Sequence, residues 1–202
     1  MSELERLLQI SIAQHDHLCP RQVLGVRMGM YAADLLHVPY QQKDKRLHTF
    51  VETDGCFADG ISAATGCTLG HRTLRLMDFG KVAATFVDTQ TEQVVRIRPS
   101  LDSRQQAAVY VPEARSRWHR QLEAYQVMPL EDLFDVQTVT LTVSMQALIS
   151  RPGIRVNCNV CGEEILNERE VVHEGLTLCR ACAGHSYYRV NEGVYPLQAE
   201  MA

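Results

Sequence analysis

The stretch HDHLCPRQVLGVRMG, residues 15–29, decides the fold of the first part of the chain. Pro20 disfavours helical geometry at the residue before it and suits the first position of a helix, so we expect a helix from Pro20 to about His37. Gly25 and Gly29 lie four residues apart in this helix, and each glycine costs about 1 kcal/mol of helix propensity relative to alanine. That cost indicates that another element packs closely against the helix.

Hydrophobic periodicity predicts helices and strands mixed along the rest of the first part. Helices are expected at 3–14, at 55–64 and from Pro112 onward, and strands at 46–53, 82–88, 93–98 and 136–143. Hairpin-like strands among helices favour an α+β or mixed-sheet domain over a regular βαβ series. The segment Ser150-Arg151-Pro152-Gly153 is the best linker candidate, which predicts a domain of residues 1–150 and a smaller module of residues 154–202.

The composition is that of a chain that buries a core. Hydrophobic residues make up 46% and charged residues 22% of the sequence, which argues against disorder. The start, MSELERLLQIS, carries two acids and no long apolar run, so we expect neither a secretory signal nor a membrane span and place the protein in the cytoplasm. The net charge of −4 disfavours nucleic acid as a partner.

Four of the seven cysteines form two close pairs near the end of the chain. Cys158 and Cys161 stand in CNVC, Cys179 and Cys182 stand in CRAC, and 17 residues separate the two motifs. Each CxxC folds into a tight knuckle with both sulfurs pointing inward, and two knuckles supply the four thiolates of a tetrahedral Zn²⁺. Because sulfur fills all four positions, we predict a structural zinc ion that contributes much of the folding free energy of this module.

The segment between the two cysteine pairs supports the zinc prediction. Residues 170–173 and 176–178 flank Glu174-Gly175, which predicts a hairpin that returns the chain to the second pair. A helix is expected to begin at Cys179, giving a treble-clef-like or zinc-ribbon-like module. We expect this module to dock onto a partner subunit or a second protomer.

A second group of candidate ligands lies near the start of the chain. His15, His17 and Cys19 are spaced at i, i+2 and i+4, so an extended backbone points all three side chains to one side, as chelation requires. Cys19 immediately precedes the helix at Pro20. Free backbone amides and the helix dipole at that position favour the thiolate over the thiol.

Cys56 is expected in a similar position, at the start of the second short helix. His17, Cys19 and Cys56 would give three protein ligands and an open fourth position, the pattern of a catalytic metal site. Asp59 shares a helix face with Cys56, and Asp59 or His15 could complete the shell or act as a base. The spacing leaves a plainer alternative open, because cysteine is commonly a small buried hydrophobe and such short patterns often match by chance.

Two further residues lie in recognisable motifs. Cys67, in TGCTLG, is expected to pack at a helix end. Lys81, in MDFGK, is by default a solvated lysine, although a lysine close to a thiol would lower the pKa of that thiol.

Taken together, these motifs resemble a known family. HDHLCPRQVLGVRMG, VETDGCFADGISAATGCTLG and LMDFGKVAATFVD, followed by the double CxxC tail, are similar to the FmdE-like proteins, named after a component of formylmethanofuran dehydrogenase. The resemblance implies a thioredoxin-like α+β domain with a mixed sheet, a treble-clef zinc finger and a homodimer. It also implies an active-site cleft that can hold a metal. The positions that match the family motifs are His17, Cys19, Cys56 and Asp59, with Cys67 and Lys81 nearby.

Three functions are compatible with these features. The first is a metal-binding accessory or catalytic protein of molybdenum or tungsten redox enzymes, with a second metal, zinc among the candidates, near the N-terminus. The second is a thiol-redox or sulfur-handling protein, in which a disulfide would have to join distant cysteines such as Cys19 and Cys56. The third is a zinc-finger docking module. The sequence indicates neither a substrate nor a small-molecule ligand.

Overall fold

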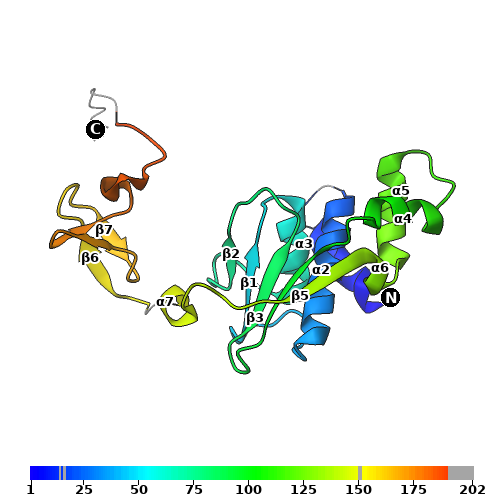
Figure 1. Ribbon diagram of the computed structural model, residues 1–202, viewed down its shortest axis with the longest axis horizontal. Coiled ribbons are helices and arrows are strands. Elements are labelled where there is room, and N and C mark those ends of the chain that lie inside the picture. Colours follow the sequence, from blue (N-terminus) through cyan, green and yellow to red (C-terminus); the bar gives the residue numbers. More distant parts are fainter. Residues whose placement is uncertain (14, 16, 150–151, 191–202) are drawn as a thin grey trace, which may run out of the picture. The chain divides into compact units, whose positions relative to one another are not determined.

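The chain folds into two compact units, Met1–Thr142 and Val143–Ala202. The structure is a computed structural model that describes residues 1–13, 15, 17–149 and 152–190 (Figure 1). The division falls before the predicted linker, of which Ser150 and Arg151 lie outside the described residues. Within the described ranges, no helix is both long enough and apolar enough to cross a bilayer.

The first unit is built on a five-stranded sheet in the order β2-β1-β3-β4-β5. Strand β1 pairs in parallel with β2, and the other neighbouring strands are antiparallel. The strands are β1 (Leu47–Val51), β2 (Leu74–Leu76), β3 (Ala84–Asp88), β4 (Val94–Pro99) and β5 (Phe134–Thr138). The predicted α+β fold with a mixed sheet is confirmed.

Six helices of this unit lie within the described residues. They are α1 (Glu3–Ile12), α2 (Pro20–Leu35), α3 (Cys56–Thr65), α4 (Ser103–Tyr110), α5 (Arg117–Val127) and α6 (Leu130–Leu133). The helix expected from Pro112 begins instead at Arg117, because the Ser116 side chain caps it by accepting a hydrogen bond from the His119 amide at 3.3 Å. Helix α4 was not predicted, since it buries only Ser103 and Ala107 and has no apolar stripe.

Glycines allow α2 and α3 to cross in close contact. A Cβ atom at Gly25 would lie 2.3 Å from the carbonyl oxygen of Phe57, and one at Gly60 would lie 2.4 Å from the carbonyl oxygen of Gln22. No residue larger than glycine fits either position without moving a helix backbone. The close neighbour that the glycines of α2 predicted is therefore α3.

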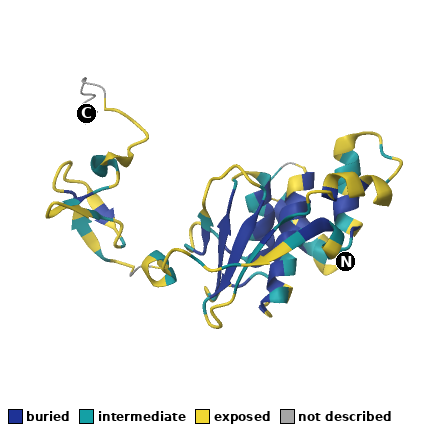
Figure 2. Ribbon diagram, viewed as in Figure 1, coloured by how far each residue is buried: buried dark blue, intermediate teal, exposed yellow. Residues whose placement is uncertain are grey.

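The core lies between these helices and the sheet. Buried side chains of α1, α2 and α3 pack with Leu47, Val51, Phe86 and Ile97 of the strands. Figure 2 shows the buried residues concentrated in β1, β3 and the helices beside them. Helix α5 packs against α2 and α4.

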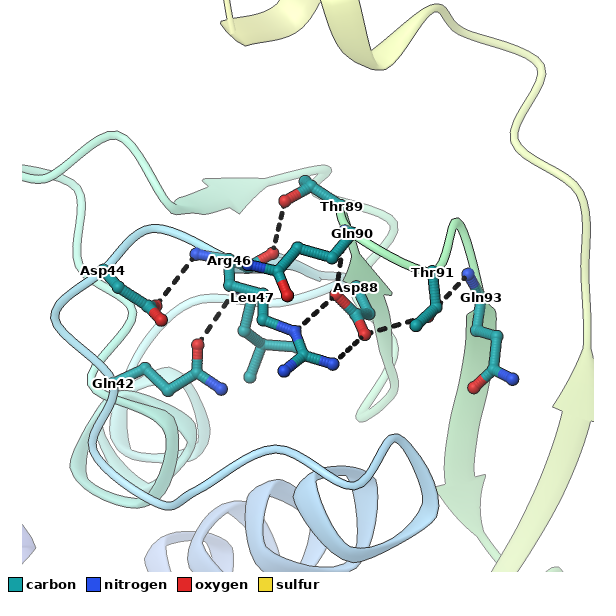
Figure 3. Close-up of polar contacts among 9 residues, drawn as sticks. All are labelled: Gln42, Asp44, Arg46, Leu47, Asp88, Thr89, Gln90, Thr91 and Gln93. Carbon is teal, nitrogen blue, oxygen red and sulfur yellow. Dashed lines mark hydrogen bonds and ion pairs between the residues drawn. The ribbon is translucent and has the colours of Figure 1, made fainter.

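A closed polar network fixes the start of β1 to the turn between β3 and β4 (Figure 3). Arg46 donates two hydrogen bonds to the Asp88 carboxylate, at 2.8 and 2.6 Å. The Gln90 amide and the Thr91 hydroxyl donate to the same carboxylate, at 2.9 and 2.8 Å. Foremost among these, the Arg46 guanidinium holds the pKa of the buried Asp88 carboxyl well below its usual range. Every partner belongs to the fold, so the network is structural.

The second unit consists of small hairpins and short helical turns. Its elements are α7 (Met145–Ile149), β6 (Arg155–Asn157), β7 (Glu164–Leu166), β8 (Val171–His173), β9 (Leu176–Leu178) and the helical turn η1 (Ala181–His185). Strands β6 and β7 form one antiparallel hairpin, and β8 and β9 form the hairpin that was predicted. The expected helix begins at Ala181 rather than at Cys179, because residues 179–182 form the second knuckle.

Candidate functional site

The four cysteines of the second unit converge on one point. Their Sγ atoms all lie within 4.8 Å of one another, and those of Cys161 and Cys179 are 3.9 Å apart. Four sulfurs bound tetrahedrally at about 2.3 Å from a zinc ion would be roughly 3.8 Å apart, so small side-chain adjustments suffice. Among the described residues, this is the only such convergence of three or more His, Cys, Asp or Glu ligand atoms.

Full ionisation of the four thiols in this cluster would require a cation. Hydrogen bonds from the backbone amides of Cys161 and Cys179 lower the pKa of the Cys158 thiol to about 6. Hydrogen bonding to Cys179 and the other neighbouring thiols raises the pKa of Cys182 to about 12. Four sulfurs this close cannot all ionise unless a positive ion balances their charge, which Zn²⁺ does. The donor set therefore fits a structural zinc ion.

In the first unit, α2 and α3 cross in close contact, and Cys19 and Cys56 lie at the starts of these two helices. Cys19 is the N-cap of α2, and Cys56 is the first residue of α3. Burial raises the pKa of the Cys19 thiol most strongly, the Gln22 amide opposes this, and the hydrogen-bonding and charge effects of Cys56 raise it further. The two thiols are therefore neighbours, although they lie far apart in the sequence.

The predicted thiolate preference of Cys19 is wrong for the protein without a metal. The Cys19 residue is only 8% exposed, and the cost of burying a charge exceeds the stabilisation by amides at the helix start. Cys56 is half-buried and so remains open to solvent on one side.

Gln22 holds Cys19 in place from both sides. The Cys19 sulfur accepts a hydrogen bond from the Gln22 amide at 3.4 Å, and the Gln22 side-chain oxygen accepts one from the Cys19 amide at 2.8 Å. The Gln22 side-chain nitrogen donates to the carbonyl and hydroxyl oxygens of Ser11, both at 3.1 Å. Sequence reasoning missed Gln22, although Cys19-Pro-Arg-Gln22 has the spacing of a capping box with cysteine as the cap.

His15 and Asp59 form a pair beside the two thiols. His15 Nε2 and Asp59 Oδ2 are 2.6 Å apart, so the segment before α2 is joined to the first turn of α3. Their side chains are 28% and 38% exposed, which leaves both within reach of a ligand. A carboxylate that orients an imidazole is a common arrangement for a general base.

The remaining candidates are His17, Cys67 and Lys81. His17 is exposed and does not join Cys19 and Cys56 in a three-ligand cluster among the described residues. Cys67 is packed in the core, as expected, with its sulfur donating to the Leu47 carbonyl oxygen at 3.3 Å. Lys81 is exposed and its Nζ atom lies 5.9 Å from the centre of the Phe79 ring.

A groove of about 390 Å³ lies along α3, between this helix and residues of β1 and β2. Its apolar lining includes Val51, Leu69, Leu74 and Leu76, and its acidic lining consists of Asp54 and Asp59. Asp59 thus belongs both to the groove and to the pair with His15. No sequence pattern indicated this groove, because its walls come from three segments that only the fold brings together.

Comparison with protein families divides the chain in a similar way. A family model described as "FmdE, Molybdenum formylmethanofuran dehydrogenase operon" matches residues 14–135, more than half of the chain. A model of the prokaryotic dksA/traR C4-type zinc finger matches residues 153–188, which include all four tail cysteines.

Two individual proteins are similar over most of the chain. A probable S-adenosyl-L-methionine-binding protein of Archaeoglobus fulgidus is 28% identical over 221 aligned positions, covering 99% of this chain but 58% of that protein. The chain therefore spans less than two thirds of this relative. A crystal structure of a tungsten formylmethanofuran dehydrogenase FmdE-like protein from Syntrophus aciditrophicus has a TM-score of 0.57 and 20% identity, with 92% of this chain and 95% of that chain covered. At that identity the likeness concerns the fold.

Proposed function

The chain belongs to the FmdE family, and we propose that it is a metal-binding accessory or catalytic protein of molybdenum- or tungsten-dependent redox enzymes. Its tail carries a C4-type zinc finger whose four cysteines converge as a structural zinc site requires. The family description, which names a molybdenum formylmethanofuran dehydrogenase operon, supports the association with such enzymes. The S-adenosyl-L-methionine of the archaeal relative is not assigned to this chain, because much of that relative lies outside the match.

The functional centre that we propose is a second metal site at the paired starts of α2 and α3. The observation that carries this proposal is that Cys19 and Cys56 are neighbouring thiols. Two thiolates are soft ligands that suit Zn²⁺, and positions not filled by protein would remain open to an incoming ligand. A metal bound there would supply Lewis-acid chemistry, and the His15 and Asp59 pair beside it could accept a proton.

His17 would be a third, weaker ligand of this site. Its side chain is exposed, and it forms no three-ligand cluster with Cys19 and Cys56 among the described residues. The two cysteines are therefore the principal ligands, and His17 is a third ligand whose contribution an experiment can separate from theirs.

Metal content per chain tests the proposal. Wild-type protein loaded with excess Zn²⁺ and then freed of loose metal should retain two ions, as measured by elemental analysis. Cys19→Ser and Cys56→Ser should each retain one, whereas Cys67→Ala, which removes a core cysteine, should still retain two. His17→Ala should retain two ions but release one of them more readily to a chelator. A wild-type protein that never holds more than one ion would reject the second site.

A thiol-redox function is the second candidate, and the same neighbouring thiols favour it. Oxidation would join the Cys19 and Cys56 sulfurs in a disulfide. The two electrons and two protons that the thiols release would reduce the disulfide of a partner protein to two thiols. Thiol counting after incubation with oxidised glutathione distinguishes the two functions. If the wild-type protein loses two free thiols and the Cys19→Ser variant does not, redox chemistry is favoured. Thiols that stay free in the wild-type protein would count against it.

We also expect a cytoplasmic homodimer whose zinc module docks onto a partner subunit or the second protomer. Exposed apolar residues of the module, including Val160, Val172 and Tyr187, support a docking role. Sedimentation of the full chain and of a chain ending at residue 142 would test whether the tail contributes to the association.

A further inference from the structure

The groove along α3 combines an apolar floor with two carboxylates. Leu74 is buried, whereas Leu69 and Leu76, which also line the groove, are 70% and 44% exposed. Asp54 and Asp59 supply its charge, and no lysine, arginine or histidine is among the described residues that line it. The groove therefore offers apolar contact and negative charge to the same occupant.

The fold itself does not account for the charge of Asp54. Helix α3 has Gly55 as its N-cap and no side-chain hydrogen bond at that cap, so the exposed Asp54 does not cap the helix. Asp59 is held by His15 at 2.6 Å, which fixes the direction of its carboxylate at the edge of the groove. A cationic group bound in the groove would form ion pairs with these carboxylates.

We infer that the groove binds a small organic cation, an amine carried on an apolar ring or short chain. The volume of about 390 Å³ falls in the range of small-molecule sites, which are mainly apolar with a few polar groups that orient the ligand. The leucines would cover the apolar part, and the ammonium group would lie toward Asp54 and Asp59. This site goes beyond the proposed metal centre and does not depend on it, since neither Cys19 nor Cys56 lines the groove.

A bound amine would lie close to the proposed functional centre. Asp59 is three residues beyond Cys56 on α3, so the two side chains are about one helical turn apart. The groove would then hold the apolar part of a substrate while its nitrogen end points toward the His15 and Asp59 pair. The substrate class of any reaction at this centre would accordingly be an apolar amine.

Benzylamine is a suitable probe, with benzyl alcohol and benzoate as analogues of similar shape. Titrations of the full-length protein followed by ¹H–¹⁵N NMR should show saturable shifts at Ser62, Leu69 and Leu74 with benzylamine. Benzyl alcohol should bind more weakly, and benzoate should not bind. Raising NaCl from about 0.05 to 0.5 M should weaken benzylamine binding and leave benzyl alcohol unchanged, because salt screens exposed charges.

Three variants locate the site. Asp54→Asn should weaken benzylamine binding about two- to fivefold, the effect expected for an exposed ion pair. Ser62→Leu should fill the groove and abolish saturable shifts. Asp102→Asn is the matched control, because Asp102 is an exposed N-cap residue of α4 that makes no side-chain cap hydrogen bond. It should bind benzylamine as the wild type does.

The titration also separates the groove from the metal centre and from other occupants. In the double variant Cys19→Ser/Cys56→Ser, benzylamine binding should persist even though the second metal ion is lost. Equal binding of benzyl alcohol, or no effect of Asp54→Asn and Ser62→Leu, would overturn the inference. Groove shifts that depend on protein concentration and not on benzylamine would show instead that a second copy of the chain covers the groove.

Discussion

The two groups of cysteines reach their positions by different routes. In the tail, two CxxC motifs and a short hairpin bring four sulfurs within 4.8 Å of one another through contacts that are local in sequence. In the first unit, Cys19 and Cys56 become neighbours only because α2 and α3 cross at Gly25 and Gly60. The tail site therefore follows from the spacing of residues in the sequence, whereas the N-terminal pair depends on how two helices pack.

The two units also differ in what stabilises their folded state. The second unit has a small buried cluster of Cys158, Ile165 and Leu178, so a metal ion must contribute much of its stability. The first unit has an extensive core of its own, and neither Cys19 nor Cys56 belongs to that cluster of buried residues. Disturbing the metal should unfold one unit, whereas disturbing the helix crossing should damage the other.

Removal of zinc should give the largest effect. Structural zinc sites in small modules bind with apparent free energies of about 10 kcal/mol or more, so Cys158→Ser or a strong chelator should unfold the second unit. NMR spectra should lose the dispersed signals of residues 155–185 and retain those of the first unit. Dispersed tail signals in a zinc-free protein would contradict the contrast between the two regions.

A methyl group at the helix crossing should give the next largest effect. In Gly60→Ala the new Cβ would lie 2.4 Å from the Gln22 carbonyl oxygen, and such overpacking should lower the free energy of unfolding by about 3 kcal/mol. Gly70→Ala is the control, because nothing lies within 4 Å of a Cβ at that position. Urea unfolding of both variants measures the difference, and equal stability would disprove the close crossing.

Loss of the buried carboxylate at the hairpin should cost somewhat less. Asp88→Asn removes charged hydrogen bonds to Arg46 and should lower the free energy of unfolding by about 2 kcal/mol near neutral pH. The pKa of Asp88 is lowered in the folded protein, so its stabilisation is complete above the usual carboxyl value of 3.8 and is lost as the pH falls below it. The gap between wild type and Asp88→Asn should therefore shrink below about pH 4, and a constant gap in acid would count against the network.

Removal of the Gln22 side-chain amide should have the smallest effect on stability and a specific effect on metal. Gln22→Met leaves the Cys19 amide and Ser11 without partners, which should cost about 1.5 kcal/mol. Loss of an outer-shell partner typically weakens metal binding about 10- to 100-fold, so zinc at the N-terminal site should weaken accordingly. Competition with a colourimetric chelator should show the tail site unchanged; weakening of both sites would contradict their independence.

The sequence predicted the parts that depend on local pattern. The tail cysteines, the hairpin before the second knuckle, and the helix that begins at Pro20 all follow from short-range spacing. Gly25 correctly indicated a close neighbour, because a glycine inside a helix lowers the stability of that helix unless close packing compensates.

The parts that the sequence did not predict depend on contacts between distant segments. Strand β2 has only three residues, too few for an alternating pattern, and α4 lacks an apolar stripe. The high pKa of Cys19 reflects burial that its position at a helix start does not reveal. The spacing of His17 and Cys19 likewise gave no indication that His17 is exposed while Cys19 is buried.

The most direct test of the account is an anomalous-scattering map at the zinc absorption edge from crystals of fully loaded protein. It should show two peaks per chain, one among the four tail cysteines and one about 2.3 Å from the Sγ atoms of both Cys19 and Cys56. A single peak in the tail, with the Cys19 and Cys56 sulfurs bound to nothing or joined in a disulfide, would contradict the second metal site.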